Sequence, residues 1–116
     1  MLPRSFDLSE AVGKFRAAAK TRDELDPDFV LIARTDARGV AGGSVEAVIE
    51  RSKAYIDAGV DMIFPEGLTS KKEISEVCDK VCAPIHFNRT GVSPMLTLDE
   101  LNEMGIAMVS FATGAL

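Results

Sequence analysis

Three polar side chains with complementary chemistry each follow a short apolar run of the sequence. Arg34 comes after FVLIA, Glu66 after MIFP and Asn88 after PIHF. The planar guanidinium of arginine suits a carboxylate or a phosphate, glutamate can orient a hydroxyl group or exchange a proton, and asparagine can donate to an anion without adding charge. Together these residue types suit a small anionic, oxygen-rich ligand.

The apolar runs have the length and composition of buried strands. We expect strands at about residues 29–33, 62–66, 84–88 and 107–112, separated by amphipathic stretches with helical spacing. Strands separated by whole helices should be parallel, with right-handed crossovers. The chain is therefore expected to form one α/β domain over residues 1–116, with about four strands and four helices.

Helix boundaries are also marked in the sequence. The segments SKKE (70–73) and TLDE (97–100) have the spacing of a capping box, which satisfies the unpaired amides at a helix start. Gly59 and Gly105 stand where a helix would end in a left-handed cap, each within three residues of the next expected strand.

Four strands are few for a parallel sheet that stands alone. Units of about 23 residues are typical of the (β/α)8 barrel, in which eight such units close the sheet. We therefore expect half of a TIM barrel. A small open doubly wound sheet is the alternative, and its ligand site would also lie at the carboxyl ends of the strands.

The three polar residues are expected to meet at one edge of the sheet. Side chains two residues apart on a strand point the same way, so Arg34, Glu66 and Asn88 would each end a row on one face. The carboxyl rim is where barrels hold their active sites, which predicts a single site. The alternative is that Arg34 and Glu66 only pair with each other as a structural ion pair. Asp36, two residues after Arg34, is predicted to support the arginine.

Other residues offer weaker signals. His86 is the only histidine and precedes Asn88 by two residues; a catalytic role and a hydrogen-bonded core position both stay open, and the core position is the commoner outcome. The D-x-D spacing in DELDPD (23–28) could hold a divalent cation, but it precedes the first strand, where a solvated turn is expected. GGS (42–44) could bind phosphate through backbone amides, without a longer glycine pattern to support it.

The composition excludes several classes of partner. Thirteen basic and eighteen acidic residues give a net charge of −5, spread along the chain, so nucleic acid and anionic membrane surfaces are not expected as partners. No apolar run has the length of a membrane span, and the first residues do not show the pattern of a signal peptide. For Cys78 and Cys82 we expect free thiols in a reducing cytoplasm, with a disulfide or a metal pair as the alternatives.

Longer segments of the chain resemble the isocitrate lyase/phosphoenolpyruvate mutase superfamily, in particular its methylisocitrate lyase-like members. These segments are LIARTDARG (31–39), EAVIERSKAYIDAGVDMIFPEGL (46–68) and PIHFNRTGVSPMLTLDELNEMG (84–105). The resemblance implies the C-terminal half of a (β/α)8 barrel. It also implies a Mg2+-dependent lyase that cleaves a carbon–carbon bond in small 2-hydroxy or 2-oxo di- or tricarboxylates and stabilises an enolate.

Position by position, the resemblance implies roles for four residues. Arg34 would grip a substrate carboxylate, Glu66 would be the catalytic glutamate near the substrate and a metal-bound water, and Asn88 would bind substrate with Thr90 beside it. The segment NRTGVSP (88–94) is shorter than the corresponding family loop and lacks its acidic residue. The identity of the substrate is therefore left open.

Family members also carry an upstream half, which holds the acidic residues for Mg2+ and a K-x-C-G-H loop with an acid/base cysteine. No segment here matches that loop, and no direct metal ligand is expected in this chain. We therefore expect the chain to supply the carboxylate-binding half of the site, to be inactive alone, and to form homo-oligomers or to associate with a missing N-terminal half. The alternative is a non-catalytic carboxylate-binding domain or a truncated remnant that acts only with a partner chain.

Overall fold

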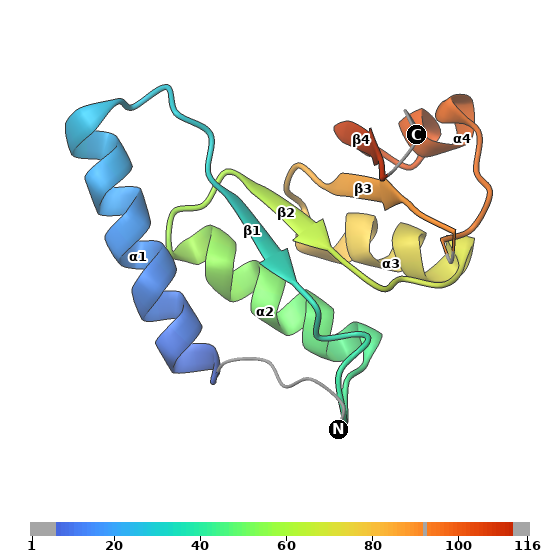
Figure 1. The fold of residues 1–116 in the computed structure, drawn as a ribbon, viewed down its shortest axis with the longest axis horizontal. Helices are drawn as coiled ribbons and strands as arrows, with labels where there is room; N and C mark the ends of the chain where they lie inside the picture. The colour runs from blue at the N-terminus through green and yellow to red at the C-terminus, as the bar shows by residue number, and fades with distance from the viewer. Residues whose placement is uncertain (1–6, 92, 113–116) are drawn as a thin grey trace.

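Helices and strands alternate along the whole of the described chain. The computed structural model describes residues 7–91 and 93–112 (Figure 1). The elements follow in the order α1 (Leu8–Leu25), β1 (Ile32–Thr35), α2 (Val45–Asp57), β2 (Met62–Pro65), α3 (Lys71–Val81), β3 (His86–Arg89), α4 (Leu98–Glu103) and β4 (Met108–Phe111). The expected sequence of four helices and four strands is thus confirmed within these residues.

The strands are parallel, as the sequence predicts. β1 pairs with β2 and β3 pairs with β4, and a single parallel bridge between Ile63 and Ile85 links the two pairs. The amide of Ile63 donates to the carbonyl of Pro84 at 3.0 Å, which completes this link. The four strands therefore lie side by side in chain order.

β1 begins later than the expected start at residue 29. The amide of Phe29 donates back to Asp26 in the turn that ends α1, which keeps Phe29 out of the strand layer. Leu31 is where the chain first reaches β2: its carbonyl accepts from the amides of Asp61 and Met62, and its own amide donates to the Asp61 carboxylate. The segment DELDPD therefore forms the end of α1 and the following turn.

One face of the strands is covered by helices. α2 lies along β1 and β2, α3 packs beside α2, and α1 packs against the other side of α2 (Figure 1). Ala33 and Ile63 point to this covered face and are completely buried. Val48 of α2 and Val77 of α3 are equally buried, so the core lies between the strands and these helices.

The opposite face of the strands is more open. We call it the inner face; its side chains are those of Ile32, Arg34, Met62, Phe64, His86, Asn88, Met108 and Ser110. Ile32 and Met108 leave 40% and 45% of their surfaces exposed, whereas Ala33, beside Ile32 on the other face, is fully buried. Parallel sheets are ordinarily covered on both faces, so this exposure distinguishes the inner face from the core face.

The helix boundaries follow the sequence signals. Thr97 and Glu100 form a complete capping box at the start of α4, as expected. At α3, the Ser70 hydroxyl accepts from the Glu73 amide, but the Glu73 carboxylate accepts from the amide of Thr69 rather than from that of Ser70. Gly59 ends α2 with a φ of +111°, a left-handed conformation that favours glycine.

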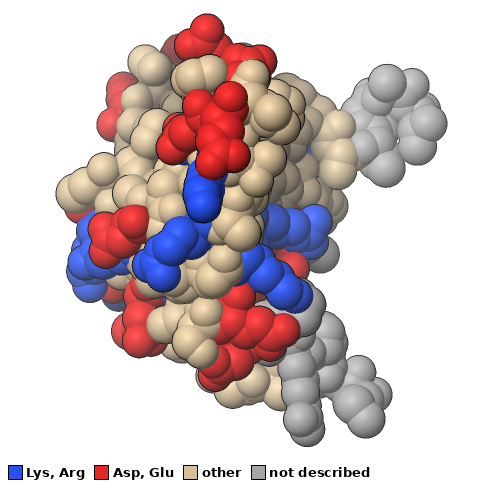
Figure 2. Space-filling view, turned by 90° about the vertical axis from the view of Figure 1, so that its left-hand side faces the viewer, with Lys and Arg blue, Asp and Glu red and all other residues tan. Residues whose placement is uncertain are grey.

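The outer side of α1 carries charges of both signs. Figure 2 shows this face of the molecule, with basic groups in a band across its middle and acidic groups above and below. Arg22 donates to the carboxylate of Asp61 and to the carbonyl of Gly59, which fixes α1 to the start of β2. Among the described helices, none is long and apolar enough to cross a bilayer.

Candidate functional site

Arg34 stands at the carboxyl end of β1 on the inner face, and it is half-exposed. Its Nη2 and Nε donate to one carboxylate oxygen of Asp36, at 3.0 and 3.3 Å. The hydrogen bond to Asp36 raises the pKa of Arg34, burial opposes this rise, and the negative charges of Asp36 and Glu66 add to it. Within the described residues Arg34 pairs with Asp36 and not with Glu66, so the predicted alternative of an Arg34–Glu66 ion pair is not formed.

Glu66 and Asn88 lie together at the ends of β2 and β3. The Nδ2 of Asn88 donates to Oε2 of Glu66 at 3.3 Å. The backbone amide of Glu66 donates to the carbonyl of Thr35 at 2.9 Å, so the pairing of β1 with β2 continues to the point where Glu66 leaves the strand. The structure thus brings two of the three predicted residues into contact, with Arg34 on the neighbouring strand.

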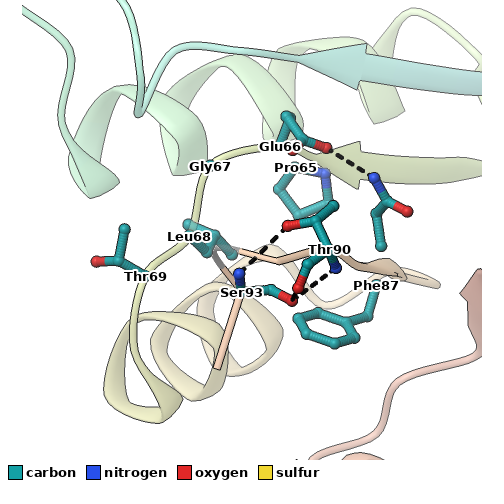
Figure 3. A pocket seen from close by; sticks show the side chains of 9 residues that line it. Pro65, Glu66, Gly67, Leu68, Thr69, Phe87, Thr90 and Ser93 are labelled. Carbon is teal, nitrogen blue, oxygen red and sulfur yellow. Dashed lines mark hydrogen bonds between the residues drawn. The ribbon is translucent and has the colours of Figure 1, made fainter. Parts of the chain in front are cut away.

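A small hollow lies between the segments that follow β2 and β3. Glu66, Leu68, Asn88, Thr90 and Ser93 are among the residues that line it (Figure 3). Glu66 presents its carboxylate to this region, and the dashed line drawn from it marks a hydrogen bond that it accepts. Polar side chains and Phe87 line the hollow from β3 and the loop after it, and residues 65–69 line it from the other side. Its volume of about 20 Å³ is that of a water-sized space.

Thr90 forms a local turn with Ser93. The Thr90 amide donates to the Ser93 hydroxyl at 2.8 Å, the Ser93 amide donates to the Thr90 hydroxyl at 3.2 Å, and the Ser93 hydroxyl donates to the Thr90 carbonyl at 2.9 Å. These bonds hold the loop after β3 against the hollow. The predicted location of Thr90 beside Asn88 agrees with this geometry, and its role in substrate binding stays a prediction.

His86 lies deeper on the inner face than Asn88. Its ring meets the ring of Phe64 edge to face with 4.4 Å between centroids, and the guanidinium carbon of Arg34 lies over the Phe64 ring, 5.3 Å from its centroid. His86 is 5% exposed, and burial lowers its pKa, which favours the neutral imidazole. Neither ring nitrogen has a partner in the part of the chain that the structure describes. The expected hydrogen bonds of a core histidine are therefore not present within these residues.

Ser110 is a polar residue of this region that the sequence analysis did not single out. It faces Asn88 in the register of β3 and β4, and its hydroxyl donates to Oδ1 of Asn88 at 2.9 Å. The sequence contains one hint of this residue, because Ser110 is the polar residue in the otherwise apolar run AMVSFA. A serine inside a strand is too common to be recognised without the contact.

The loops that carry Arg34 and Glu66 are tied together below the rim. Arg38 donates to the Glu73 carboxylate at 3.1 Å, and the same carboxylate accepts from the amide of Thr69 at 2.8 Å. A Cβ atom on Gly67 would meet the Gly39 amide nitrogen at 3.6 Å, so the two loops are in direct contact there. Gly67 has a φ of +87°, which another residue would adopt only with strain.

The residues present do not make a magnesium site by themselves. Within residues 7–91 and 93–112, no group of three or more histidine, cysteine, aspartate or glutamate side chains is placed to hold a metal ion. Asp36 and Glu66 are carboxylates near the rim, but Asp36 is engaged by Arg34 and Glu66 by Asn88.

The remaining sequence candidates have structural positions. Cys78 and Cys82 are both free, so the disulfide alternative is not formed. Burial of Cys78, with a smaller effect of Asp79, raises the pKa of its thiol to about 11. Ser44 of the GGS segment caps α2 by accepting from the Ala47 amide at 3.1 Å.

Comparison with known proteins places this geometry in a family. The family model described as phosphoenolpyruvate phosphomutase matches residues 3–116. The 2-methylisocitrate lyase of Escherichia coli (strain K12) is 42% identical over 108 residues, which cover 91% of this chain and 35% of that protein. The chain therefore spans about a third of the length of this curated relative.

Solved structures agree with the sequence relatives. A 2,3-dimethylmalate lyase, described as a PEP mutase/isocitrate lyase superfamily member, superimposes with a TM-score of 0.86 at 33% identity, over 94% of this chain and 39% of that one. An oxaloacetate acetylhydrolase in complex with the product oxalate gives a TM-score of 0.87 at 36% identity, over 97% of this chain and 40% of that one.

The matched family model, the sequence relatives and the fold together define the class. The chain belongs to the isocitrate lyase/phosphoenolpyruvate mutase superfamily, whose members include carbon–carbon lyases. Within it, the chain is methylisocitrate lyase-like. Its parallel β/α units correspond to part of the TIM barrel of these relatives, which confirms the barrel expectation over the open doubly wound alternative.

Proposed function

We propose that this chain supplies the carboxylate-binding side of a carbon–carbon lyase site that acts on small 2-hydroxy or 2-oxo di- or tricarboxylates. The observation that carries the proposal is the arrangement of Arg34, Glu66 and Asn88 on neighbouring parallel strands of a methylisocitrate lyase-like fold. Relatives named as 2-methylisocitrate lyase and 2,3-dimethylmalate lyase support the class of substrate.

Arg34 is the carboxylate ligand in this proposal. Asp36 accepts hydrogen bonds from Nε and Nη2 and so fixes the plane of the guanidinium, while Nη1 has no partner among the described residues. A substrate carboxylate can therefore approach Nη1 without breaking the Asp36 contact. A charge-assisted hydrogen bond of this kind contributes more than a neutral one.

Glu66 and Asn88 bind the part of the substrate next to that carboxylate. Glu66 accepts from Asn88 through Oε2, which leaves Oε1 to accept from the hydroxyl group of a 2-hydroxy acid. Cleavage of the carbon–carbon bond in such an acid requires removal of the hydroxyl proton, and Glu66 is the candidate catalytic residue for that transfer. Asn88 and Thr90 also line the hollow beside Glu66, whose volume of about 20 Å³ admits only a water-sized group, so the substrate would lie on the open inner face.

We further propose that cleavage needs groups outside the described residues. The superfamily resemblance implies Mg2+ and an acid/base cysteine, and the described part of this chain contains no three-ligand cluster to hold the metal. A complementing segment or a second chain would supply these groups and cover the open inner face. Two free cysteines are compatible with a reducing compartment such as the cytoplasm.

Isothermal titration calorimetry with oxaloacetate, pyruvate and succinate tests the binding proposal. Arg34→Ala should weaken carboxylate binding by roughly tenfold or more, because a hydrogen bond to a charged group is lost. Arg16→Ala, which removes an exposed arginine of α1, is the matched control and should bind as the parent does. Equal binding by the parent and Arg34→Ala would show that the site assignment is wrong.

A non-catalytic carboxylate-binding domain is the second candidate, favoured by the lack of a three-ligand metal cluster in the described residues. Product analysis with 2-methylisocitrate and 2,3-dimethylmalate, with and without added Mg2+, separates the two. Binding without cleavage supports the non-catalytic candidate for this chain by itself. Mg2+-dependent cleavage by a monodisperse monomer would contradict the proposal that a complementing chain is needed.

A further inference from the structure

Three strands are connected at the rim by a chain of side-chain hydrogen bonds. The hydroxyl of Ser110 in β4 donates to Oδ1 of Asn88 in β3 at 2.9 Å, and Nδ2 of Asn88 donates to Oε2 of Glu66 after β2 at 3.3 Å. Ser110 and Asn88 are partners in the parallel register, and both are partly buried. The amide of Asn88 is therefore held at both of its ends.

The chemistry of these groups fixes the direction of the amide. A carboxylate only accepts hydrogen bonds, so Glu66 requires the NH2 end of Asn88 on its side. A serine hydroxyl can donate, and by donating to Oδ1 it holds the carbonyl end of the amide on the β4 side. If the amide rotated by 180°, its oxygen would face the acceptor oxygen of Glu66 and the bond between Asn88 and Glu66 would be lost, whereas the Ser110 hydroxyl could still accept from Nδ2. Glu66 therefore selects the orientation, and Ser110 adds a second anchor that restrains the amide in it.

The fixed amide has one donor left over. Of the two hydrogens on Nδ2, one points to Glu66, and the other has no partner within the described residues. Asn88 also lines the hollow that Glu66 and Thr90 share. A ligand on the inner face beside Asn88 therefore meets a donor from this amide, which favours carboxylate oxygens over groups that only donate.

We propose that Ser110 is a positioning residue that sharpens the specificity of this site: by holding Oδ1 it restrains the Asn88 amide, whose orientation Glu66 selects, so that the remaining N–H is offered to a ligand carboxylate. The part of this inference that concerns the ligand rests on the proposed carboxylate-binding function. The part that concerns the orientation of Asn88 does not, because the hydrogen bonds exist without a ligand. The two parts can be measured separately.

The orientation can be measured by NMR without any ligand. The sequence contains two asparagines, Asn88 and Asn102, and no glutamine, so a 15N–1H correlation spectrum holds only two side-chain amide pairs. Asn102 is exposed on α4 and is the internal control; Asn88→Asp identifies the other pair by removing it. The backbone signals of the same spectrum report whether each variant is folded.

Ser110→Ala should shift the Asn88 amide pair toward the position of an unconstrained amide and speed its exchange with water, and leave the Asn102 pair unchanged. Ser110→Thr, which keeps the hydroxyl, should preserve the parent signal of Asn88. An Asn88 pair that is the same in Ser110→Ala and in the parent, with the backbone spectrum intact, would overturn the inference. An equal shift in Ser110→Ala and Ser110→Thr would also overturn it, since the hydroxyl would not be the cause.

The specificity can be measured by binding. For succinate, Ser110→Ala should lower the affinity by about three- to tenfold, the range expected for one neutral hydrogen bond. For succinamate, in which one carboxylate is replaced by an amide, the loss should be smaller, because a positioned N–H contributes more to an ionised carboxylate than to a neutral amide carbonyl. The ratio of the two affinities is a quantity that a general loss of packing would not change.

The outcomes distinguish this inference from the proposed function. If the parent binds no carboxylate, the proposed function fails, and the NMR comparison alone decides whether Ser110 orients Asn88. If the parent binds succinate through Arg34 but Ser110→Ala keeps the parent's ratio of succinate to succinamate affinity, the proposed function stands and the specificity role of Ser110 is wrong.

Discussion

The two faces of the strand layer should differ in their contribution to stability, and two isoleucines in paired strands test this. Ile63 in β2 faces the helices and is completely buried, whereas Ile32 in β1 lies on the inner face and leaves 40% of its surface exposed. Each replacement by alanine removes three carbon atoms. The chemical change is the same, so the difference reports the environment.

The magnitudes follow from burial. At about 0.8 kcal/mol per buried methylene, Ile63→Ala loses about 2.4 kcal/mol of transfer free energy, and a cavity term brings the total into the usual range of about 2–5 kcal/mol. Ile32 is 60% buried, the remainder of the 40% exposed, so Ile32→Ala should lose about 1.4 kcal/mol at most. No cavity term applies at Ile32, because the inner face is open to water.

Urea unfolding followed by circular dichroism measures both values, provided that the transition is two-state. The reasoning would be refuted if Ile32→Ala destabilised the chain as much as Ile63→Ala. That result would mean that the inner face is covered in solution. A concentration-dependent midpoint would then identify self-association as the cover.

Three further predictions concern individual side chains. Gly13→Ala should stabilise the protein by about 0.5–1 kcal/mol, since the added Cβ meets nothing within 4 Å in α1. Gly59→Ala should cost about 1–3 kcal/mol, because its φ is +111° and its Cβ would lie 2.7 Å from a neighbouring side chain, so the urea midpoints of the two variants should move in opposite directions. Burial of Glu73 opposes its ionisation, but hydrogen bonds from Thr69 and Arg38 outweigh this and lower its pKa. The contribution of Glu73 to the free energy of unfolding is therefore present above the ordinary pKa of 4.5 and is lost as the pH falls through the lowered pKa. Glu73→Gln should flatten the dependence of stability on pH in acid, and an unchanged slope would contradict the assignment. Iodoacetamide should modify exposed Cys82 well before Cys78, which is partly buried and whose thiol has a pKa raised to about 11. Peptide mass spectrometry of the parent and of Cys82→Ser measures the two rates, and fast labelling of Cys78 in Cys82→Ser would be the contrary result.

Several local features of the fold follow from the sequence because their causes are local. The capping box of Thr97 and Glu100 and the left-handed cap at Gly59 each depend on a few adjacent residues. The exact start of β1 did not follow, because the apolar residues Phe29 and Val30 satisfy the strand pattern but have no neighbouring strand to pair with. Pairing begins only where Leu31 meets Asp61, a residue thirty positions away.

The candidate site was predicted in part for the same reason. Alternation along strands was enough to select Arg34, Glu66 and Asn88, since direction on a strand is a property of the sequence itself. It offered Asp36 as support for Arg34 and left an Arg34–Glu66 ion pair as the alternative, because the choice between them depends on distances across the strands. It could not find Ser110, whose only distinction is the atom it contacts.

The sequence by itself determined that this chain is a series of parallel β/α units, because periodicity is encoded residue by residue, and its resemblance to known segments pointed to the isocitrate lyase/phosphoenolpyruvate mutase superfamily. The tertiary structure alone decided which side chains touch. The register of β3 and β4 brings Ser110 against Asn88, and the bridge from β2 to β3 brings Asn88 against Glu66. Hydrogen bonds need contact within about 3 Å, and only the packed strands provide contact between residues so far apart in the chain.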